Sequence, residues 1–264
     1  MSQIACIVLP VYNEAVNLRL LLPRIFDQQE RIATHELHVL VVDDNSPDGT
    51  AAVVEEHRKR FPRLHLLHGE RQGLGCAYQR GMAHALATLR PALIFEMDAD
   101  LQHDPDLIPG FIARSQEGYT VQIGSRYVPG GATPDFPWHR RLVSRVGNWL
   151  ARVGGGLSPI RDITSGYRCI DAALLTRCDL HHLATRGYAF QTSLLSELVH
   201  HGARVVEIPI VFPDRLYGQS KLSSRDYVEF LVMLVKLTLR RRWLPRRLSP
   251  AFRRPAKPIA KVPV

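Results

Sequence analysis

Short apolar runs alternate with longer amphipathic segments through the first half of this chain of 264 residues. Runs with the length and composition of buried strands occur at residues 4–11, 37–42, 64–67, 92–97 and 120–124. Segments with helical character lie between them, at 14–27, 51–60, 73–89 and 106–116. Strands that alternate with helices are typical of a parallel sheet covered by helices. We therefore predict an α/β fold with a mainly parallel, doubly wound sheet.

The pattern changes after Arg126. A loop rich in proline and glycine is predicted at 128–137, and a basic amphipathic helix follows at 138–153. The region 162–202 has no clear period, and a late strand is predicted at 203–212. The second half is therefore not a simple continuation of the strand-helix alternation.

The end of the chain is predicted to form a separate helix and a tail. Either Ser223 or Ser224 caps this last helix. We divide the chain into a globular domain at 1–222, an amphipathic helix at 223–244 and a basic tail at 245–264. Because the tail is rich in proline, we expect it to be disordered.

The composition is that of a globular chain, but the charge is unevenly distributed. Apolar residues make up 45% and charged residues 22% of the sequence. The net charge at pH 7 is +9, and residues 240–264 hold nine Lys or Arg and no Asp or Glu. Basic residues beside Trp243 and an apolar helix favour an anchor on an anionic membrane surface. A solvated tail is the second interpretation and nucleic-acid binding the third, so no nucleic-acid partner is expected.

The apolar runs and the cysteines argue against several classes of protein. We expect no signal peptide, because the first apolar run lacks a basic flank. The segment 227–239 is interrupted by Glu229 and Lys236 and is shorter than the ~20 residues of a membrane span. The four cysteines have no Cys-x-x-Cys pairing, which indicates reduced thiols, and no His/Cys pattern suggests zinc. A cytoplasmic protein without a transmembrane helix is predicted.

Turn chemistry follows the second predicted strand and precedes the third helix. The segment 43–50 contains Pro-Asp-Gly, and Thr50 is predicted to cap the helix at 51–60. Gly73 and Gly75 open the next helix without the third glycine of a dinucleotide fingerprint. We interpret this pair of glycines as a sign of close backbone approach or helix packing.

Two carboxylates lie one residue apart after the fourth predicted strand. Asp98 and Asp100 follow the run 92–97, at a strand end where ligands bind in α/β sheets. If the chain stays extended, their side chains and that of Gln102 point the same way. Such oxygen ligands suit Mg²⁺ or Mn²⁺, with water and substrate phosphates in the remaining positions. The alternative is that Asp-x-Asp only begins a loop and that Asp104 caps the next helix.

Six short motifs occur in a fixed order along most of the chain. They are Leu-Pro-Val-Tyr-Asn-Glu at 9–14, Val-Val-Asp-Asp-Asn-Ser-Pro-Asp-Gly-Thr at 41–50, Met-Asp-Ala-Asp-Leu-Gln-His at 97–103, Gly-Ser-Arg-Tyr at 124–127, Thr-Ser-Gly-Tyr-Arg at 164–168 and Asp-Arg-Leu-Tyr-Gly-Gln-Ser-Lys at 214–221. With these motifs the sequence resembles family 2 glycosyltransferases. Within that family it is similar to the dolichyl-phosphate mannose synthases and their bacterial polyprenyl-phosphate relatives.

The resemblance implies a GT-A fold and assigns roles by motif. The nucleoside of a sugar nucleotide, most naturally GDP-mannose, is expected at Pro10, Tyr12, Glu14, Val42 and Asp44. The divalent metal ion and the diphosphate are expected at Asp98, Ala99, Asp100 and Gln102. Phosphate-binding cations are expected at Arg126, Arg215 and Lys221, with Arg140 in the position of another.

The chemistry that the resemblance implies follows from charge. A departing nucleoside diphosphate needs a metal ion and cations to stabilise it. A polyprenyl phosphate acceptor is already anionic near pH 7, because the second phosphate pKa is about 6. We therefore hypothesise an in-line, inverting displacement without a general base, with Asp100, Arg126 and Arg140 as catalytic residues. Arg126 and Arg140 would present the acceptor, and Arg215 and Lys221 would steady the diphosphate; each arginine has the alternative of a solvated surface charge.

The sequence also departs from the family pattern. Thr192-Ser193 stands after Phe190-Gln191 where relatives have an acidic residue, and Gln219 stands where Glu is common. We expect an enzyme held on the cytoplasmic face of a membrane by its C-terminal helix and basic tail, and the sequence leaves a membrane partner subunit open. Two alternatives remain: a GT-A enzyme that acts on a polysaccharide or soluble acceptor, and a non-catalytic module that binds nucleotide sugars or associates with nucleic acid.

Overall fold

Within the residues that the structure describes, seven strands form one sheet in the order β3-β2-β1-β4-β6-β5-β7. The structure is a computed structural model that describes residues 2–158, 160–180, 183, 187, 189–214 and 224–243. The strands are β1 (Gln3–Val11), β2 (His35–Asp43), β3 (Leu64–His68), β4 (Leu93–Glu96), β5 (Val121–Ser125), β6 (Arg168–Asp171) and β7 (Val205–Pro209). All neighbours pair in parallel except β6, which is antiparallel to both β4 and β5. The predicted α/β fold with a mainly parallel sheet is confirmed.

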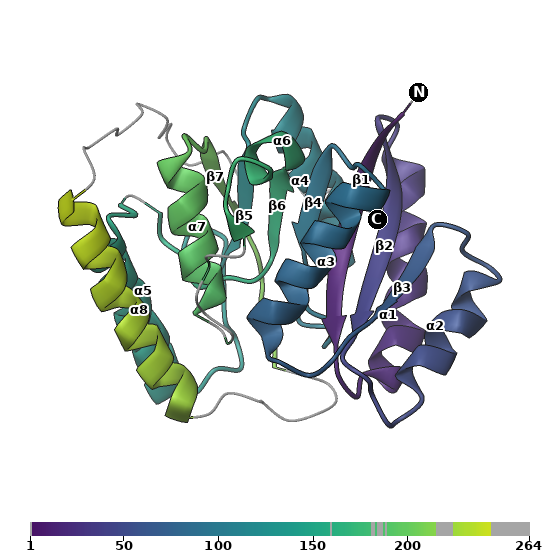
Figure 1. The fold of residues 1–264 in the computed structure, drawn as a ribbon, viewed down its shortest axis with the longest axis horizontal. Coiled ribbons are helices and arrows are strands. Elements are labelled where there is room, and N and C mark those ends of the chain that lie inside the picture. The colour runs from purple at the N-terminus through teal and green to yellow at the C-terminus, as the bar shows by residue number, and fades with distance from the viewer. Residues whose placement is uncertain are drawn as a thin grey trace.

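Helices cover both faces of the sheet (Figure 1). One face packs against α1 (Ala15–Asp27), α2 (Thr50–Arg58) and α4 (Ile108–Gln116). The other packs against α3 (Leu74–Thr88), α6 (Ala172–Leu175) and α7 (Phe190–His200). Two 3₁₀ turns, η1 (Gln28–Arg31) and η2 (Pro105–Leu107), join these elements. Alternate residues of each strand feed the two cores, as a sheet buried on both faces requires.

The parallel register brings three strand ends to one edge of the sheet. Pro10 lies opposite Val42 in β2, and Val8 lies opposite Glu96 in β4. The loops that follow β1, β2 and β4 therefore begin side by side. In open α/β sheets this edge is where ligands bind.

Helix α3 lies unusually close to the sheet at Gly81. A Cβ atom there would come within 2.6 Å of a Val8 methyl carbon and 2.7 Å of a Val42 methyl carbon. The helix begins after Gly73, whose φ of 107° is a conformation that favours glycine. The two glycines thus bring α3 against the strands that carry the loops of the ligand-binding edge.

Two long helices, α5 (Trp138–Gly155) and α8 (Ser224–Trp243), lie side by side at one end of the molecule (Figure 1). The Thr238 hydroxyl donates to the Gly154 carbonyl oxygen at 3.2 Å. Gly154 permits this approach, because a Cβ atom there would lie only 3.0 Å from the Thr238 oxygen. Met233 and Leu234 of α8 are buried, so the helix packs on the domain along one stripe. No helix in the described part of the chain is long and apolar enough to cross a bilayer.

Some local predictions are corrected. Thr50 does not cap α2: it is the first helical residue, and its amide and hydroxyl both donate to the Asp48 carboxylate. Asp48 can reach them because Gly49, with φ of 87°, folds the turn back. The predicted strand at 203–212 is shorter, because only Val205–Pro209 pairs with β5. Helix α8 begins at Ser224, and Ser223 lies outside the described residues.

Candidate active site

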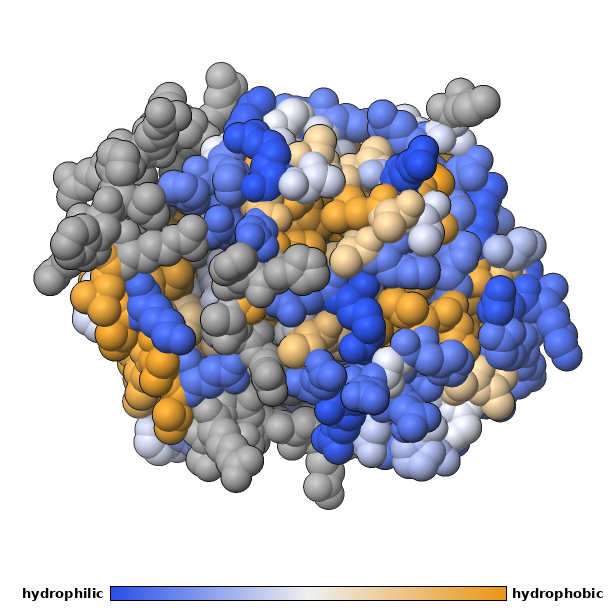
Figure 2. All heavy atoms as spheres, viewed as in Figure 1, coloured by the Kyte–Doolittle hydropathy of each residue, from blue (hydrophilic) through white to orange (hydrophobic). Residues whose placement is uncertain are grey.

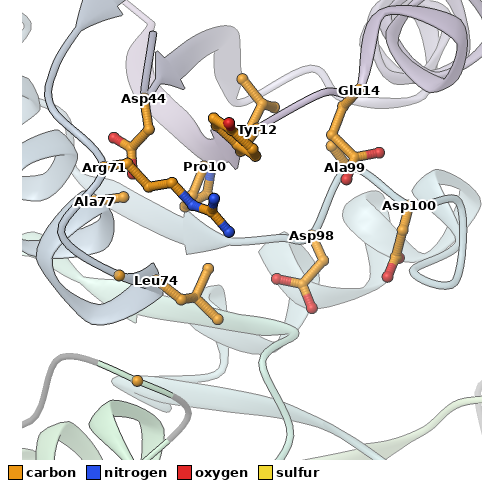
Figure 3. Close-up of a pocket in the computed structure, with 13 residues that line it drawn as sticks. Pro10, Tyr12, Glu14, Asp44, Arg71, Leu74, Ala77, Asp98, Ala99 and Asp100 are labelled. Carbon is orange, nitrogen blue, oxygen red and sulfur yellow. The ribbon is translucent and has the colours of Figure 1, made fainter. Parts of the chain in front are cut away.

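A pocket of about 210 Å³ opens at the edge where β1, β2 and β4 end (Figure 3). We call it the donor pocket. It is lined by Pro10, Val11, Tyr12, Glu14, Asp44, Arg71, Gly73, Leu74, Ala77, Asp98, Ala99, Asp100 and Gly187. Carboxylates dominate the polar part of this lining, so the pocket can bind a cation or the donor groups of a ligand.

The loop after β4 holds the two carboxylates of the predicted metal site. Asp98 and Asp100 both line the donor pocket, and Figure 3 shows their carboxylates on the same side of the loop. The chain does not stay extended beyond them, because Leu101 has φ of 66°, in the left-handed region. Gln102 is buried instead, and its amide nitrogen donates to the Pro213 carbonyl oxygen at 2.5 Å. The alternation that was expected to align Gln102 with the two aspartates is therefore broken at Leu101.

Asp98 is held from both its side chain and its backbone. The Tyr78 hydroxyl of α3 donates to Asp98 Oδ1 at 3.1 Å. Burial, and after it the Asp98 charge, raises the pKa of Tyr78, so the phenol keeps its proton and remains a donor. The backbone N–H of Asp98 donates to His103 Nδ1 at 2.9 Å. Because an imidazolium cannot accept, this bond requires a neutral ring with its proton on Nε2.

His103 in turn is fixed by aromatic rings. It is buried and stacks on Tyr167 with ring centroids 4.8 Å apart, and Phe212 lies 5.5 Å away on a tilted plane. The sequence motif contains His103, but its spacing gave no role for this side chain. Its function as a support for the carboxylate loop became visible only with the fold.

A buried polar cluster lies behind the carboxylate loop. Glu96 ends β4, and its carboxylate lies 3.7 Å from the Arg168 guanidinium of β6. Burial raises the pKa of Glu96 to about 7, against the opposing effect of Arg168. Arg168 also donates to the carbonyl oxygens of Ile163 and Gln191, both at 2.6 Å. The fourth and sixth strands are therefore joined by charge as well as by backbone pairing.

The opposite wall of the donor pocket carries an aromatic ring and an ion pair. Arg71 places its guanidinium carbon 4.1 Å from the centroid of the Tyr12 ring. Asp44 pairs with Arg80 of α3. Burial raises the pKa of Asp44 above its usual value, although Arg80 works in the other direction. Neither arginine was predicted from the sequence; the only signal was the position of Arg71 just before the glycine-rich start of α3.

The loops after β1 and β2 are braced against each other. The Glu14 N–H donates to the Thr50 hydroxyl at 3.1 Å, and the Ala15 N–H donates to Asp48 Oδ2 at 3.1 Å. The Glu14 carboxylate accepts from the Asn17 amide at 2.6 Å. Six polar groups thus fix one wall of the pocket.

Arg126 is a buried, paired cation rather than an open one. Its Nε and Nη2 atoms donate to the two carboxylate oxygens of Asp162 at 2.8 and 2.7 Å, and Nη2 also reaches the Thr164 hydroxyl at 3.0 Å. Burial opposes the charged form, but the Asp162 carboxylate outweighs it and raises the pKa of Arg126 above its usual value. Among the described residues, nothing accepts a hydrogen bond from Nη1, so this one nitrogen can serve a ligand.

Arg140 lies on α5 and is held more loosely. It donates to Asp214 at 2.9 Å in a pair whose side chains are 42% and 50% exposed. Its guanidinium carbon lies 3.8 Å from the Phe136 ring centroid, and Phe136 meets Phe212 edge to face. Arg126 lies 5.4 Å from the other ring of this contact, Phe212. Two aromatic rings therefore connect the two arginines.

The sequence-predicted site residues separate into three groups. Those that line the donor pocket are Pro10, Tyr12, Glu14, Asp44, Asp98, Ala99 and Asp100. Those that the structure describes outside its lining are Val42, Gln102, Arg126 and Arg140. Val42 directs its side chain into the core against Gly81, so only its backbone is available to a ligand. Arg215, Gln219 and Lys221 lie outside the described residues.

The carboxylates fit a hard cation that shares its ligands with substrate. In the described chain no group of three or more His, Cys, Asp or Glu side chains could hold a metal ion alone. Two aspartates and a cluster of substrate oxygens are a typical environment of Mg²⁺ or Mn²⁺. The oxygen-only donor set of Asp98 and Asp100 fits such an ion and does not fit zinc.

Comparison with known proteins finds a family model and relatives that match most of this chain. The model of glycosyl transferase family 2 matches residues 6–182. The polyprenol monophosphomannose synthase of Mycolicibacterium smegmatis is 37% identical over 243 residues, which are 91% of this chain and 89% of that protein. The undecaprenyl-phosphate mannosyltransferase of Micrococcus luteus is 38% identical over 237 residues, or 89% of this chain and 94% of that protein.

Solved structures share the fold at low sequence identity. Mannosyl-3-phosphoglycerate synthase from Rubrobacter xylanophilus has a TM-score of 0.65 at 20% identity, covering 95% of this chain and 79% of that one. Glucosyl-3-phosphoglycerate synthase from Mycobacterium tuberculosis in complex with Mn²⁺, UDP and phosphoglyceric acid has a TM-score of 0.66 at 16% identity, covering 89% and 78%. The mannosyltransferase PcManGT from Pyrobaculum calidifontis in complex with GDP-Man and Mn²⁺ has a TM-score of 0.55 at 16% identity, covering 92% and 72%. The GT-A fold class that the sequence predicted is thereby confirmed.

Proposed function

Because this chain belongs to glycosyl transferase family 2 and is a glycosyltransferase, we propose that it transfers mannose from a nucleotide sugar to a polyprenyl phosphate. The relatives from Mycolicibacterium smegmatis and Micrococcus luteus carry names for this chemistry, and they match nearly the whole chain. The observation that carries the proposal is the donor pocket itself. It joins Asp98 and Asp100 to Tyr12, Glu14 and Asp44 within one cavity at the strand ends.

The nucleotide sugar we propose is GDP-mannose. The ring of Tyr12 offers a flat face to a base, and the carboxylates of Glu14 and Asp44 can accept hydrogen bonds from a base edge or from ribose hydroxyls. A mannosyltransferase of the same fold was solved in complex with GDP-Man and Mn²⁺, and another relative of this fold was solved with Mn²⁺ and UDP. The nucleoside would lie at the Tyr12 end and the diphosphate at the end with Asp98 and Asp100.

We propose that Asp98 and Asp100 hold Mg²⁺ or Mn²⁺ together with the diphosphate. Bound there, the ion would neutralise charge on the leaving diphosphate. Tyr78 and His103 keep the Asp98 side of the loop in place through the contacts described above. Gln102 could offer the ion only the oxygen of its side-chain amide, since the nitrogen of that amide donates to the Pro213 carbonyl oxygen.

Transfer would proceed by direct displacement at the anomeric carbon, with inversion. A new bond forms between a phosphate oxygen of the lipid and the anomeric carbon, while the bond from that carbon to the diphosphate breaks and its electron pair leaves with the nucleotide. The lipid phosphate needs no general base, because it is ionised near neutral pH. Among the described residues we assign its orientation to Arg126 and Arg140.

These two arginines are suited to different tasks. The buried pair of Arg126 with Asp162 is a fixed feature, so we propose that only Nη1 of Arg126 contacts the acceptor phosphate. The Arg140–Asp214 pair is exposed, and pairs of that kind contribute little stability. A phosphate can therefore displace Asp214 and bind Arg140 in its place. We further propose that Arg215 and Lys221 bind the diphosphate, as the sequence motif implies.

We also propose that the enzyme works at a membrane surface, with α5 and α8 as the contact. Helix α5 exposes six large apolar side chains and α8 five, and Figure 2 shows apolar atoms gathered over this pair. We call this surface the α5–α8 face; its members are Trp138, Leu142, Val143, Val146, Trp149, Val153, Val228, Leu231, Val232, Val235 and Leu239. Elsewhere in the part of the chain that is described, only Val16, Leu20 and Val211 are comparably exposed. Exposed Arg141 and Arg145 on α5 suit anionic head groups, and we propose an interfacial position on the cytoplasmic leaflet.

A transfer assay tests the proposal. Labelled GDP-mannose, Mn²⁺ and the purified chain are incubated with undecaprenyl phosphate, undecaprenol or 3-phosphoglycerate. We expect label in the organic phase only with the lipid phosphate. Label on the soluble acceptor would reassign the acceptor, and no transfer from GDP-, UDP- or dTDP-sugars would contradict the enzymatic proposal as a whole.

A further inference from the structure

One cation lines the donor pocket in the part of the chain that the structure describes, and it is Arg71. Arg71 lies in the segment between β3 and α3, just before Gly73. Its side chain is exposed and extends across the Tyr12 ring toward Asp98 in Figure 3. No residue of the described chain accepts a hydrogen bond from its guanidinium or forms an ion pair with it. Its donors are therefore available to a ligand.

The other arginines near the site are already engaged. Arg80 pairs with Asp44, Arg126 pairs with Asp162 in the interior, and Arg140 pairs with Asp214 on the surface. Arg71 differs from all three because it stacks on an aromatic ring and has no described carboxylate at ion-pair distance; its charge acts on Asp44 from farther away, and Asp44 is already paired with Arg80. A cation fixed in this way is preorganised for an anion.

The charge balance of the donor pocket favours such a cation. The pocket lining contains four carboxylates, from Glu14, Asp44, Asp98 and Asp100. A divalent ion would be balanced by the two aspartates that hold it, and Asp44 already has Arg80. A nucleoside diphosphate would then bring its own negative charge into an acidic pocket whose described lining offers Arg71 as its cation, beside the metal ion and the proposed Arg215 and Lys221. A guanidinium fork matches phosphate oxygens in a bidentate geometry, and its position between Tyr12 and Asp98 lies along the path from nucleoside to metal ion.

We propose that Arg71 binds the phosphates of the nucleotide sugar and remains stacked on Tyr12 while it does so. This inference rests on the proposed function, since it takes a sugar nucleotide as the ligand. Arg71 contacts the diphosphate before transfer and stabilises the charge that collects there when the glycosidic oxygen leaves. The phosphate, and not the base, is the part of the nucleotide that Arg71 recognises.

Binding of nucleotide fragments separates phosphate recognition from base recognition. Calorimetric titrations of GDP, GMP and guanosine, with Mn²⁺ present, are compared for the wild type, Arg71→Gln and Arg71→Lys. We expect Arg71→Gln to weaken GDP about tenfold, the usual effect of removing a charged hydrogen bond, and to change guanosine binding less than twofold. Arg71→Lys keeps the charge but loses the fork, so its GDP affinity should fall between the two. Arg58→Gln, a surface arginine on α2 paired only with Glu55, is the matched control and should bind like the wild type.

Other outcomes overturn the inference in distinguishable ways. An equal loss for guanosine and GDP in Arg71→Gln would assign Arg71 to the base or to the shape of the pocket. An unchanged GDP affinity would remove Arg71 from the site. If the wild type itself fails to bind GDP or UDP, the proposed function fails as well. Melting temperatures of the variants without ligand, expected to equal that of the wild type, verify that the changes act on binding.

Discussion

The donor pocket and the α5–α8 face differ in which groups they expose to a ligand: the pocket exposes charged groups and the face exposes apolar side chains. In the donor pocket, charged groups converge, and each described carboxylate or arginine is held by a neighbour, a buried partner or an aromatic ring. On the α5–α8 face, apolar side chains are left in water with arginines beside them. The described side chains of the first region come from one chain and line a cavity of small-molecule size. The second is incomplete without a large apolar surface to cover it, since contiguous exposed apolar area marks a contact site.

The same contrast separates the two arginines that connect these regions. Arg126 faces the interior with 11% of its side chain exposed, whereas Arg140 on α5 is 42% exposed. The buried Arg126–Asp162 pair is costly to break, because one charge would be left without water or a partner. The exposed Arg140–Asp214 pair costs little to break, because water solvates both charges. The acceptor phosphate would therefore meet one rigid cation and one adaptable cation.

The strongest test of the donor pocket is Asp100→Asn. We expect the rate of transfer to fall on the order of 10³-fold, because the amide cannot compensate the positive charge of a divalent ion. Initial rates at saturating Mn²⁺ measure the effect, and circular dichroism verifies folding. Asp104→Asn is the matched control, since the Asp104 side chain caps η2 and pairs with Arg24 at the surface, and the substitution keeps the backbone carbonyl that accepts from Tyr167. Transfer by Asp100→Asn within tenfold of the wild type would contradict the assignment.

The next test concerns the two arginine partners. Asp162→Asn should lower the free energy of unfolding by about 3–5 kcal/mol, because it leaves the buried Arg126 charge uncompensated. Asp214→Asn should change it by less than about 0.5 kcal/mol, because the Arg140 pair is exposed. Urea titrations at pH 7 measure both. Equal changes in unfolding free energy would mean that the Arg126–Asp162 and Arg140–Asp214 pairs contribute equally to stability despite their different burial.

Replacement of one apolar residue on α5 tests the second region. Val146→Glu should weaken binding to phosphatidylglycerol vesicles about tenfold, because it removes apolar contact and adds repulsion from anionic lipid. Val16→Glu is the control, since Val16 is 58% exposed but lies on α1, away from the α5–α8 face. Vesicle flotation measures binding for both variants. Comparable losses would show that the effect is one of charge and not of this surface, and dimer formation in the wild type would point to a second copy as the occupant.

The smallest expected effect concerns the pH dependence of stability and comes from two histidines of the sheet, outside both regions. His38 Nδ1 and His65 Nε2 are 3.0 Å apart on neighbouring strands, and burial lowers the pKa of both rings, assisted by nearby Arg63, Arg58 and His84. The unfolded chain therefore binds more protons than the folded chain below about pH 6.5, and stability should fall as the pH drops through that range. His65→Gln should flatten the dependence of unfolding free energy on pH between 7.5 and 5, and leave transfer unchanged. Exposed His139→Gln on α5 should keep the wild-type slope.

Local patterns predicted most of the donor pocket. Three walls are loops that follow the parallel strands β1, β2 and β4. Because these strands are neighbours in the sheet, their loops lie side by side at one edge. This is why Asp98 and Asp100 were expected at a strand end from the pattern alone, whereas Tyr12 and Asp44 were expected there from the family resemblance. Val42 was carried over with them, although its side chain belongs to the core.

The elements between Asp162 and His200 were not predicted, for two reasons. Strand β6 has only four residues, Arg168 to Asp171, and its first is a buried arginine, which conceals it as a strand. In α7, most side chains from Phe190 to Leu198 are buried, including Gln191 and Thr192, so no polar face marks the helix. The capping of α2 was misplaced for a local reason: the turn at Gly49 brings the Asp48 carboxylate to the start of the helix, so Asp48 accepts the bonds that Thr50 was expected to accept.

The sequence by itself determined the order of strands and helices, the position of the carboxylates beyond a strand, and the family to which the motifs belong. These follow from periodicity and from residues close together in the chain. Only the tertiary structure decided that Asp162 holds Arg126, that His103 supports Asp98, that Arg71 lies over Tyr12, and that α5 joins α8 in one apolar face. Those contacts join groups distant in sequence, and the burial that makes a charge costly or an apolar face significant exists only once the chain has folded.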